Sequence, residues 1–99
     1  MSLQKDPEGF EKKILHKYAD FKNARVLEVG CGEGRLTWKY ASASAHTYAF
    51  DSDHDALRVA RADMHPDLYG KVHFTQASAT NGIPFSKETF DIAILAWSL

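Results

Sequence analysis

The sequence is poor in cysteine and in net charge, and it lacks long apolar runs. A single cysteine, Cys31, among 99 residues excludes an internal disulfide framework. A formal net charge of −1 argues against electrostatic capture of nucleic acid or of an anionic membrane. No apolar run approaches the roughly 18 residues of a membrane-spanning helix, and no apolar signal segment is visible near the N-terminus. These absences predict a cytoplasmic protein with no membrane partner and no nucleic-acid patch.

The histidines also lack the spacing that a metal site requires. They stand at positions 16, 46, 54, 65 and 73, where no pair has the short separation typical of a zinc site. We therefore predict no metal ligand. A composition of 44% hydrophobic and 25% charged residues is that of an ordinary globular domain.

Hydrophobic periodicity predicts alternating helices and strands in a single domain over residues 1–99. We expect helices over 6–22 and 32–42 and a third that begins after the capping residue Asp53, with Leu57, Ala60 and Met64 facing the core. We expect strands over 25–29, 46–51, 71–76 and 90–97. Strands that alternate with helices predict an α/β fold with a parallel sheet.

The most informative stretch is "VLEVGCGEG", from Val26 to Gly34. Three glycines, Gly30, Gly32 and Gly34, follow the first predicted strand directly. Ligands of parallel sheets bind beyond the carboxyl ends of the strands, where glycine allows close approach of the backbone. We expect the amide groups of this loop to point into a ligand cleft at the start of a helix.

A second signal lies at the end of the second predicted strand. Asp51 follows Gly30 by twenty-one residues, the place where an acid typically accepts the hydroxyl groups of a ribose. Together the loop and the acid predict a ligand that contains a nucleoside. The dinucleotide pattern G-x-G-x-x-G fails here, because Arg35 stands at the third glycine position. Glu28, two residues before the loop, would repel a pyrophosphate and suits a ligand that also carries an amino group.

These motifs resemble those of the class I S-adenosylmethionine-dependent methyltransferases. The first motif, E/D-x-G-x-G-x-G, is present from Glu28 to Gly34, and the second, D-x-S-x-x-x-L, is present as "DSDHDAL" from Asp51. The third is present as "ASA", "IPF" and "FDIAILAWSL". The resemblance covers residues 26–99 and implies a Rossmann-like sheet of strand order 3-2-1-4, with S-adenosylmethionine as cofactor.

The resemblance also implies a set of cofactor-binding residues. Glu28 would lie near the ammonium group of the methionine portion, the glycine loop would line that portion, and Asp51 would bind the ribose. Ser52 would pack on the adenine, Ser78 and Ala79 would meet its edge, and Ala96 would border the methyl group. The full set is Glu28, Gly30, Cys31, Gly32, Gly34, Asp51, Ser52, Ser78, Ala79 and Ala96. Ser78 stands where the family usually has an acid, so its bond to the adenine would be weaker.

No catalytic residue is assigned. Cys31 could be activated at a helix N-terminus, but we favour a role in fitting a tight loop, since no histidine is placed to pair with it. We expect core packing for Trp38 and Trp97 rather than stacking on a base.

The resemblance further implies that only the cofactor-binding half is present, so the methyl acceptor is unknown. One hypothesis is a methyltransferase, and the other is a non-catalytic nucleoside-binding module; a nucleotide-dependent oxidoreductase is a weaker third. The predicted strand over 90–97 is apolar on both faces. Such a strand at a sheet edge invites pairing with another chain, so we expect a homodimer joined through it.

Overall fold

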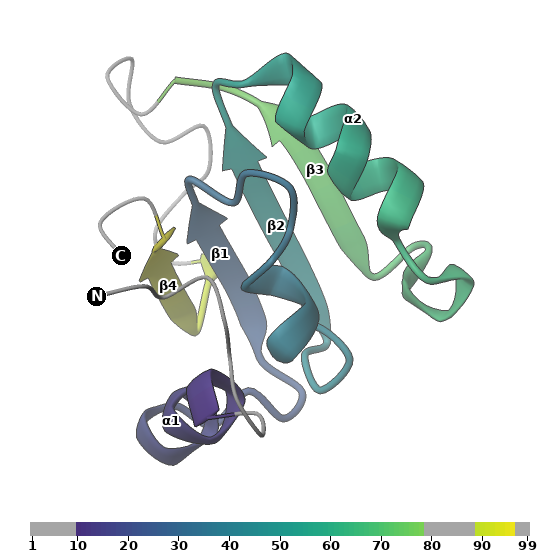
Figure 1. The fold of residues 1–99 in the computed structure, drawn as a ribbon. Coiled ribbons are helices and arrows are strands. Elements are labelled where there is room, and N and C mark those ends of the chain that lie inside the picture. The colour runs from purple at the N-terminus through teal and green to yellow at the C-terminus, as the bar shows by residue number, and fades with distance from the viewer. Residues whose placement is uncertain (1–9, 79–88, 97–99) are drawn as a thin grey trace.

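The fold is a four-stranded parallel sheet, seen in a computed structural model that describes residues 10–78 and 89–96. The strands follow the order β3-β2-β1-β4 (Figure 1). Their bounds are Arg25–Val29 for β1, His46–Asp51 for β2, Val72–Gln76 for β3 and Ile92–Leu95 for β4. The predicted fold class and strand order are confirmed. All the carboxyl ends therefore lie at one edge of the sheet.

The register divides the core into two layers. On one face, Val26 of β1 packs with Phe21 and Tyr40, while Ala49 of β2 packs with Leu57 of the second helix. Because Glu28 pairs with Ala49, its side chain shares that face. On the other face, Leu27, Val29 and Phe50 form a separate buried cluster. Both faces of β1 are thus buried, as expected for a central parallel strand.

The helices are fewer and shorter than the sequence predicts. In residues 10–78 and 89–96 the α-helices are α1, Phe10–Tyr18, and α2, His54–Asp63. Short 3₁₀ helices there are η2, Thr37–Lys39, and η3, Pro66–Leu68. The predicted end of the first helix at residue 22 is wrong. After Tyr18 the chain turns, since the Asp20 carboxylate accepts the N–H of Lys22 and Asn23 adopts a φ of 57°. The predicted start, at residue 6, lies outside the described residues.

The predicted helix over 32–42 is also wrong, because this segment forms turns around η2. Lys39 and Tyr40 donate backbone hydrogen bonds of the i to i−3 type, to Leu36 and Thr37. In a 3₁₀ helix, side chains three residues apart are eclipsed. This geometry places the Thr37 and Tyr40 side chains over the same spot on β1. Their hydroxyl groups both reach Glu28 there.

Strand β4 is shorter than the predicted 90–97 and lies at the edge of the described sheet. It pairs with β1 alone among the described strands. Ile92 and Ile94 are half-buried against the core of Val26, while Leu95 is 51% exposed. The strand is therefore apolar on both faces but covered mainly on one. Trp97 lies outside the described residues.

Within the described ranges no helix is long and apolar enough to cross a membrane. The longest α-helix among the residues that the structure describes, α2, has 10 residues, and a span needs about 20.

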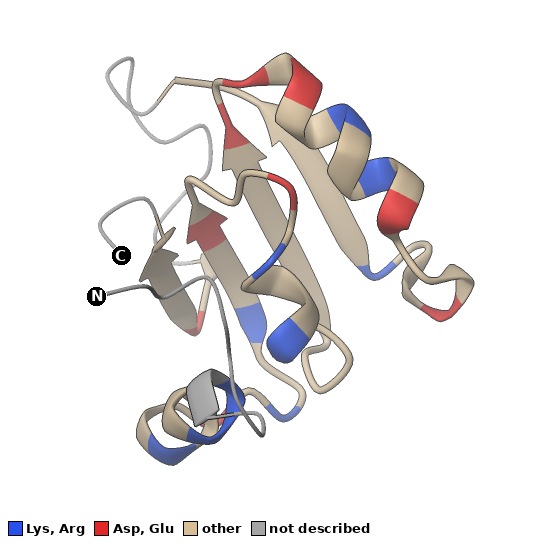
Figure 2. Cartoon of the chain, in the orientation of Figure 1, with Lys and Arg blue, Asp and Glu red and all other residues tan. Residues whose placement is uncertain are grey.

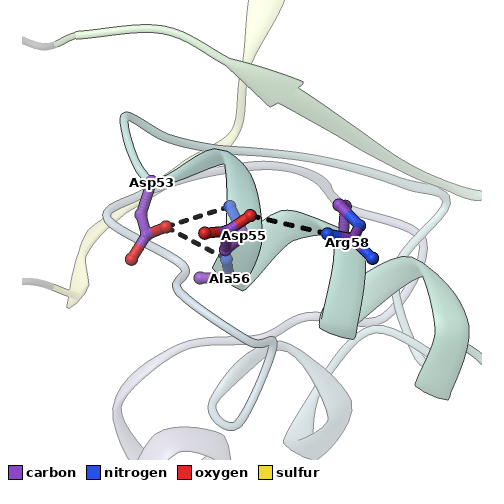
Figure 3. Close-up of polar contacts among 4 residues, drawn as sticks. All are labelled: Asp53, Asp55, Ala56 and Arg58. Carbon is purple, nitrogen blue, oxygen red and sulfur yellow. Dashed lines mark hydrogen bonds and ion pairs between the residues drawn. The ribbon is translucent and has the colours of Figure 1, made fainter.

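Helix α2 begins as the sequence predicts, at a side-chain cap (Figure 3). The Asp53 carboxylate accepts the N–H groups of Asp55 and Ala56, at 3.0 and 3.1 Å. The side chain of Asp55 lies 3.6 Å from Arg58 in an exposed ion pair. Leu57 and Ala60 are fully buried, as predicted, whereas the predicted core residue Met64 ends the helix half-buried. Asp53 therefore caps the helix, whereas Asp55 forms an exposed ion pair.

We predict that Asp53→Ala lowers the free energy of unfolding by about 1 kcal/mol, because two amide groups at the helix start lose their acceptor. The control Asp55→Ala removes only an exposed ion pair and should change stability by about 0.5 kcal/mol or less. Urea denaturation followed by circular dichroism measures both. Equal losses from the two variants would show that the cap of α2 does not act as described.

Candidate functional site

The candidate site lies at the carboxyl edge of the sheet. The ends of β1, β2 and β4 are level, since Val29 pairs with Phe50 and with Leu95. The loop over residues 30–34 follows β1 at this edge. Figure 2 shows acidic residues at the ends of β1 and β2 and at the start of α2, and basic residues mostly on the helices and below the edge. The edge is therefore the acidic side of the described chain.

Glu28 is the most unusual residue of the site, because its carboxylate is fully buried. One oxygen, Oε1, accepts two short hydrogen bonds: one from the Thr37 hydroxyl at 2.7 Å and one from the Tyr40 hydroxyl at 2.6 Å. The other oxygen, Oε2, is buried and has no hydrogen-bond partner among the described residues. Buried polar atoms are rarely left unpaired, so Oε2 marks either a cost to folding or a place for a ligand.

Burial determines the charge state of Glu28. Desolvation raises its pKa, and this outweighs the hydrogen bonds from Tyr40 and Thr37 and the positive charge of Arg35, which lower it. The carboxyl group thus retains its proton to a higher pH than an exposed glutamate does. Tyr40 responds in the same sense, since burial and the adjacent Glu28 raise its pKa.

Asp51, the second acid, binds the glycine loop to β2. Its Oδ2 accepts the N–H of Gly32 at 2.8 Å, and its Oδ1 accepts the N–H of Asp53 at 2.8 Å. Each carboxylate oxygen has a second lone pair, so the group can accept further hydrogen bonds. Asp51 is half-buried at the end of β2, where it remains reachable from solvent.

The expectation that the loop amides point into a ligand cleft is wrong for four of them. Their N–H groups donate within the chain: Gly30 and Cys31 to the carbonyl of Phe50, Gly32 to Asp51, and Gly34 to the carbonyl of Cys31. No α-helix begins after the loop, so there is no helix terminus to leave these amides unpaired. Three of these four amides bind the loop to β2, and the fourth closes the loop on itself.

Two of the glycines are required for different reasons. Gly34 has a φ of +91°, and a Cβ there would lie 2.7 Å from the indole ring of Trp38. Gly32 has a φ of +55°, and a Cβ there would meet no atom within 4 Å. Gly34 therefore makes room for Trp38, whereas the space beside Gly32 is open. Trp38 also contacts Phe74 edge-on and is half-buried, so it packs on neighbouring side chains without belonging to the buried core clusters of the described residues.

Cys31 is buried against Ala49 and Leu57. Burial and the nearby charges of Glu28 and Asp51 raise the pKa of its thiol to about 12. A thiol that stays protonated is a poor nucleophile, which favours the interpretation of Cys31 as a loop-fitting residue.

The remaining predicted residues lie around the same edge. Ser52 is exposed directly after Asp51, and its carbonyl accepts the Gln76 side-chain amide at 3.3 Å. Ser78 is half-buried two residues beyond β3, and Ala96 is half-buried next to β4. Ala79 lies outside the described residues. Sheet topology thus brings the described members of the predicted set to one edge.

Sequence reasoning missed Thr37 and Tyr40. The signal was available in part: two hydroxyl side chains three residues apart follow the loop, and an acid stands in the preceding strand. The expected α-helix over 32–42 concealed it, because in that geometry these side chains would not be eclipsed. No group of three or more metal-ligating side chains occurs in the part of the chain that the structure describes.

We predict that Gly34→Ala destabilises the chain by about 2–4 kcal/mol, since the new methyl group meets Trp38 and the backbone is left-handed. Gly32→Ala meets only the backbone cost of about 1–2 kcal/mol. Urea denaturation midpoints of the two variants test the difference. Similar midpoints would mean that Trp38 does not pack against the loop.

Comparison with known proteins indicates the family of the chain. Residues 26–99 match the family model described as a methyltransferase domain. A cobalt-precorrin-6B C(15)-methyltransferase (decarboxylating), assigned in Methanobrevibacter smithii, is 28% identical over 92% of this chain and 49% of its own length. A ubiquinone biosynthesis O-methyltransferase of Aromatoleum aromaticum is 35% identical over 79% of this chain and 33% of its own.

A solved structure from Bacillus halodurans, assigned as a methyltransferase, superposes with a TM-score of 0.72 at 32% identity. The match covers 86% of this chain and 37% of that one. The chain thus spans between a third and a half of the length of these relatives. It belongs to the methyltransferase domain family, which confirms the predicted class I S-adenosylmethionine-dependent methyltransferase fold and its cofactor.

Proposed function

We propose that the carboxyl edge of the sheet binds S-adenosylmethionine, and that the chain is the cofactor-binding part of an enzyme that transfers the methyl group to an acceptor. The observation that carries this proposal is the unpartnered Oε2 of Glu28, a buried carboxylate oxygen directly before the glycine loop. A cationic ammonium group is the partner that such an oxygen lacks.

The residues present fit this cofactor in charge and in space. The cofactor carries a sulfonium and an ammonium group, and the edge of the sheet is acidic (Figure 2). Gly32 borders open space where the methionine portion can lie. Asp51 keeps free lone pairs for the ribose hydroxyls. A dinucleotide would instead place a pyrophosphate beside Glu28 and Asp51, where like charges repel.

The roles of the other residues remain proposals that the geometry permits. Ser52 and Ser78 would contact the adenine together with Ala79, and Ala96 would border the reacting methyl group. The cofactor supplies an electrophilic methyl group, so the chain needs no acid or base of its own for this step. Its contribution is to bind and orient, which can supply much of the rate.

The residues of this chain do not identify the methyl acceptor. The two curated relatives are named for a carbon and an oxygen acceptor, respectively, although both are similar to this chain. A non-catalytic module that binds the nucleoside is the alternative, since fold alone does not settle function. A cytoplasmic location stays a prediction from the sequence.

We expect S-adenosylhomocysteine, the demethylated product, to bind more tightly than NAD in isothermal titration calorimetry. Asp51→Ala should weaken binding by about 3 kcal/mol or more, because two ribose hydroxyls lose a charged acceptor. The control Asp55→Ala removes an exposed acid of the same edge whose side chain pairs with Arg58, and it should change the affinity less than twofold. Tighter binding of NAD would overturn the proposed function.

We also propose that two copies of the chain join along residues 90–97. The support is that β4 pairs with β1 alone among the described strands and that Leu95 is half-exposed. An apolar edge strand of this kind tends to pair with a further strand. In a two-fold dimer the two β4 strands would run antiparallel.

Light scattering at micromolar concentration should give the mass of a dimer. Leu95→Lys should shift the mass to that of a monomer without unfolding the chain, since this side chain lies outside the buried clusters. Ile94→Lys would not discriminate, because Ile94 packs on the core. A folded, monomeric wild-type chain would refute the dimer.

A further inference from the structure

The buried hydroxyl groups around Glu28 form a connected network. Thr37 and Tyr40 both donate to Oε1 of Glu28. Thr47 of β2 acts to lower the pKa of Tyr40, and its hydroxyl lies 2.8 Å from that of Ser44. Ser44 donates to a backbone carbonyl, that of Ala41, at 2.7 Å. All four hydroxyl side chains are buried, so their arrangement is fixed by packing as well as by hydrogen bonds.

This network is asymmetric with respect to the carboxylate. Oε1 receives both donors, and Oε2 receives none from the described residues. Two hydroxyls on one oxygen leave the other buried and unsatisfied, although sharing the donors between both oxygens would cost less. The described residues therefore satisfy Oε1 of Glu28 and leave Oε2 available to accept a hydrogen bond from another group.

The charged and titratable groups near this carboxylate come from a few elements. Tyr40 faces it from the end of η2, and Arg35 acts on it from the loop. Cys31 interacts with it electrostatically, and Asp51 acts on Cys31 from β2. The residues paired with Glu28 across the sheet, Ala49 and Ile94, are apolar. Two cationic side chains belong to this set, Arg35 and Arg61, the second of which acts on Cys31, and both are exposed.

We propose that Thr37 and Tyr40 are positioning residues that occupy Oε1 of Glu28 and so reserve Oε2 for the ammonium group of the ligand, directly or through one bridging water. The inference rests on the proposed function and adds a basis for selectivity. The chain then discriminates between S-adenosylhomocysteine, which keeps the amino-acid portion, and 5′-methylthioadenosine, which has lost it. Both nucleosides share every other proposed contact of the adenosine portion.

The binding of the ammonium group is coupled to the ionisation of Glu28. The ammonium group binds the ionised carboxylate, whereas burial raises the pKa of Glu28 in the free protein. The pKa of Glu28 is therefore lower in the complex than in the free chain. Binding releases a proton at pH values between these two pKa values. Below the pKa of the free chain, affinity for S-adenosylhomocysteine falls by up to about tenfold per pH unit. Affinity for 5′-methylthioadenosine has no such dependence.

The experiment is isothermal titration of the 99-residue chain with each nucleoside over a range of acid to neutral pH, in two buffers of different ionisation enthalpy. We expect the affinity for S-adenosylhomocysteine to rise with pH to a plateau with net release of up to one proton. We expect 5′-methylthioadenosine to bind with a flat profile and no proton release. Identical profiles for the two nucleosides would overturn the inference and leave the proposed function standing. Absence of binding by both would overturn the two together.

Matched variants at one position separate positioning from packing. Thr37→Val keeps the shape but loses the donor, so the pKa of Glu28 rises and the binding profile moves to higher pH. At a fixed pH below the plateau, selectivity for S-adenosylhomocysteine should fall roughly tenfold. Thr37→Ser keeps the donor and should restore the wild-type profile. Val72→Ala, a cavity variant in β3, should lower stability without moving the profile. Equal profiles for Thr37→Val and Thr37→Ser would contradict a positioning role.

Discussion

The structure depends on one buried carboxylate, that of Glu28. A carboxylate in the centre of a parallel sheet is costly unless nearby groups donate hydrogen bonds to it. The two donors come from Thr37 and Tyr40, nine and twelve residues along the chain. To bring both hydroxyls to the same oxygen, the segment after the glycine loop forms a 3₁₀ turn instead of an α-helix. The site, the loop and the packing of η2 against β1 all follow from this requirement.

The stability of the fold is linked to pH through the same residue. The pKa of Glu28 is raised in the folded chain, so the folded state binds its proton more tightly than the unfolded state does. The contribution of this linkage to stability is therefore complete below the pKa of an exposed glutamate and is lost as pH rises through the raised pKa. Burial thus has an energetic cost at neutral pH. A cation bound at Oε2 would offset that cost, which couples the stability of the fold to the ligand.

Asp51 complements Glu28 in organising the edge of the sheet. It joins the glycine loop to the start of α2 through two backbone amides and remains partly exposed. Glu28 is buried and held by side-chain hydrogen bonds, whereas Asp51 is accessible and held by hydrogen bonds from backbone amides. Together they make this edge acidic among the described residues, the reverse of what a phosphate-rich ligand needs.

Much of the fold was predictable from the sequence because its signals are local. The strands over 25–29 and 46–51, the cap at Asp53 and the buried Leu57 follow from apolar runs and cap chemistry, and the strand order follows from the family resemblance. The segment over 32–42 was not predictable from periodicity, because its conformation is set by a contact with Glu28 that lies outside the segment. The glycine spacing predicts that Gly34 belongs to a ligand-binding loop, whereas in the structure a Cβ on Gly34 would meet the Trp38 side chain. The hydrogen bonds of the buried Glu28 come from Thr37 and Tyr40 in the later segment around η2, a contact that no local pattern encodes.

The most direct test of this account is the titration of the Glu28 side-chain carboxyl carbon by ¹³C NMR, in the free chain and with S-adenosylhomocysteine bound. The account predicts that the pKa of Glu28 in the free chain lies above that of an exposed glutamate and decreases when the ligand binds, because the ammonium group stabilises the ionised form. A Glu28 signal that titrates like that of an exposed glutamate, or that does not respond to the ligand, would contradict it.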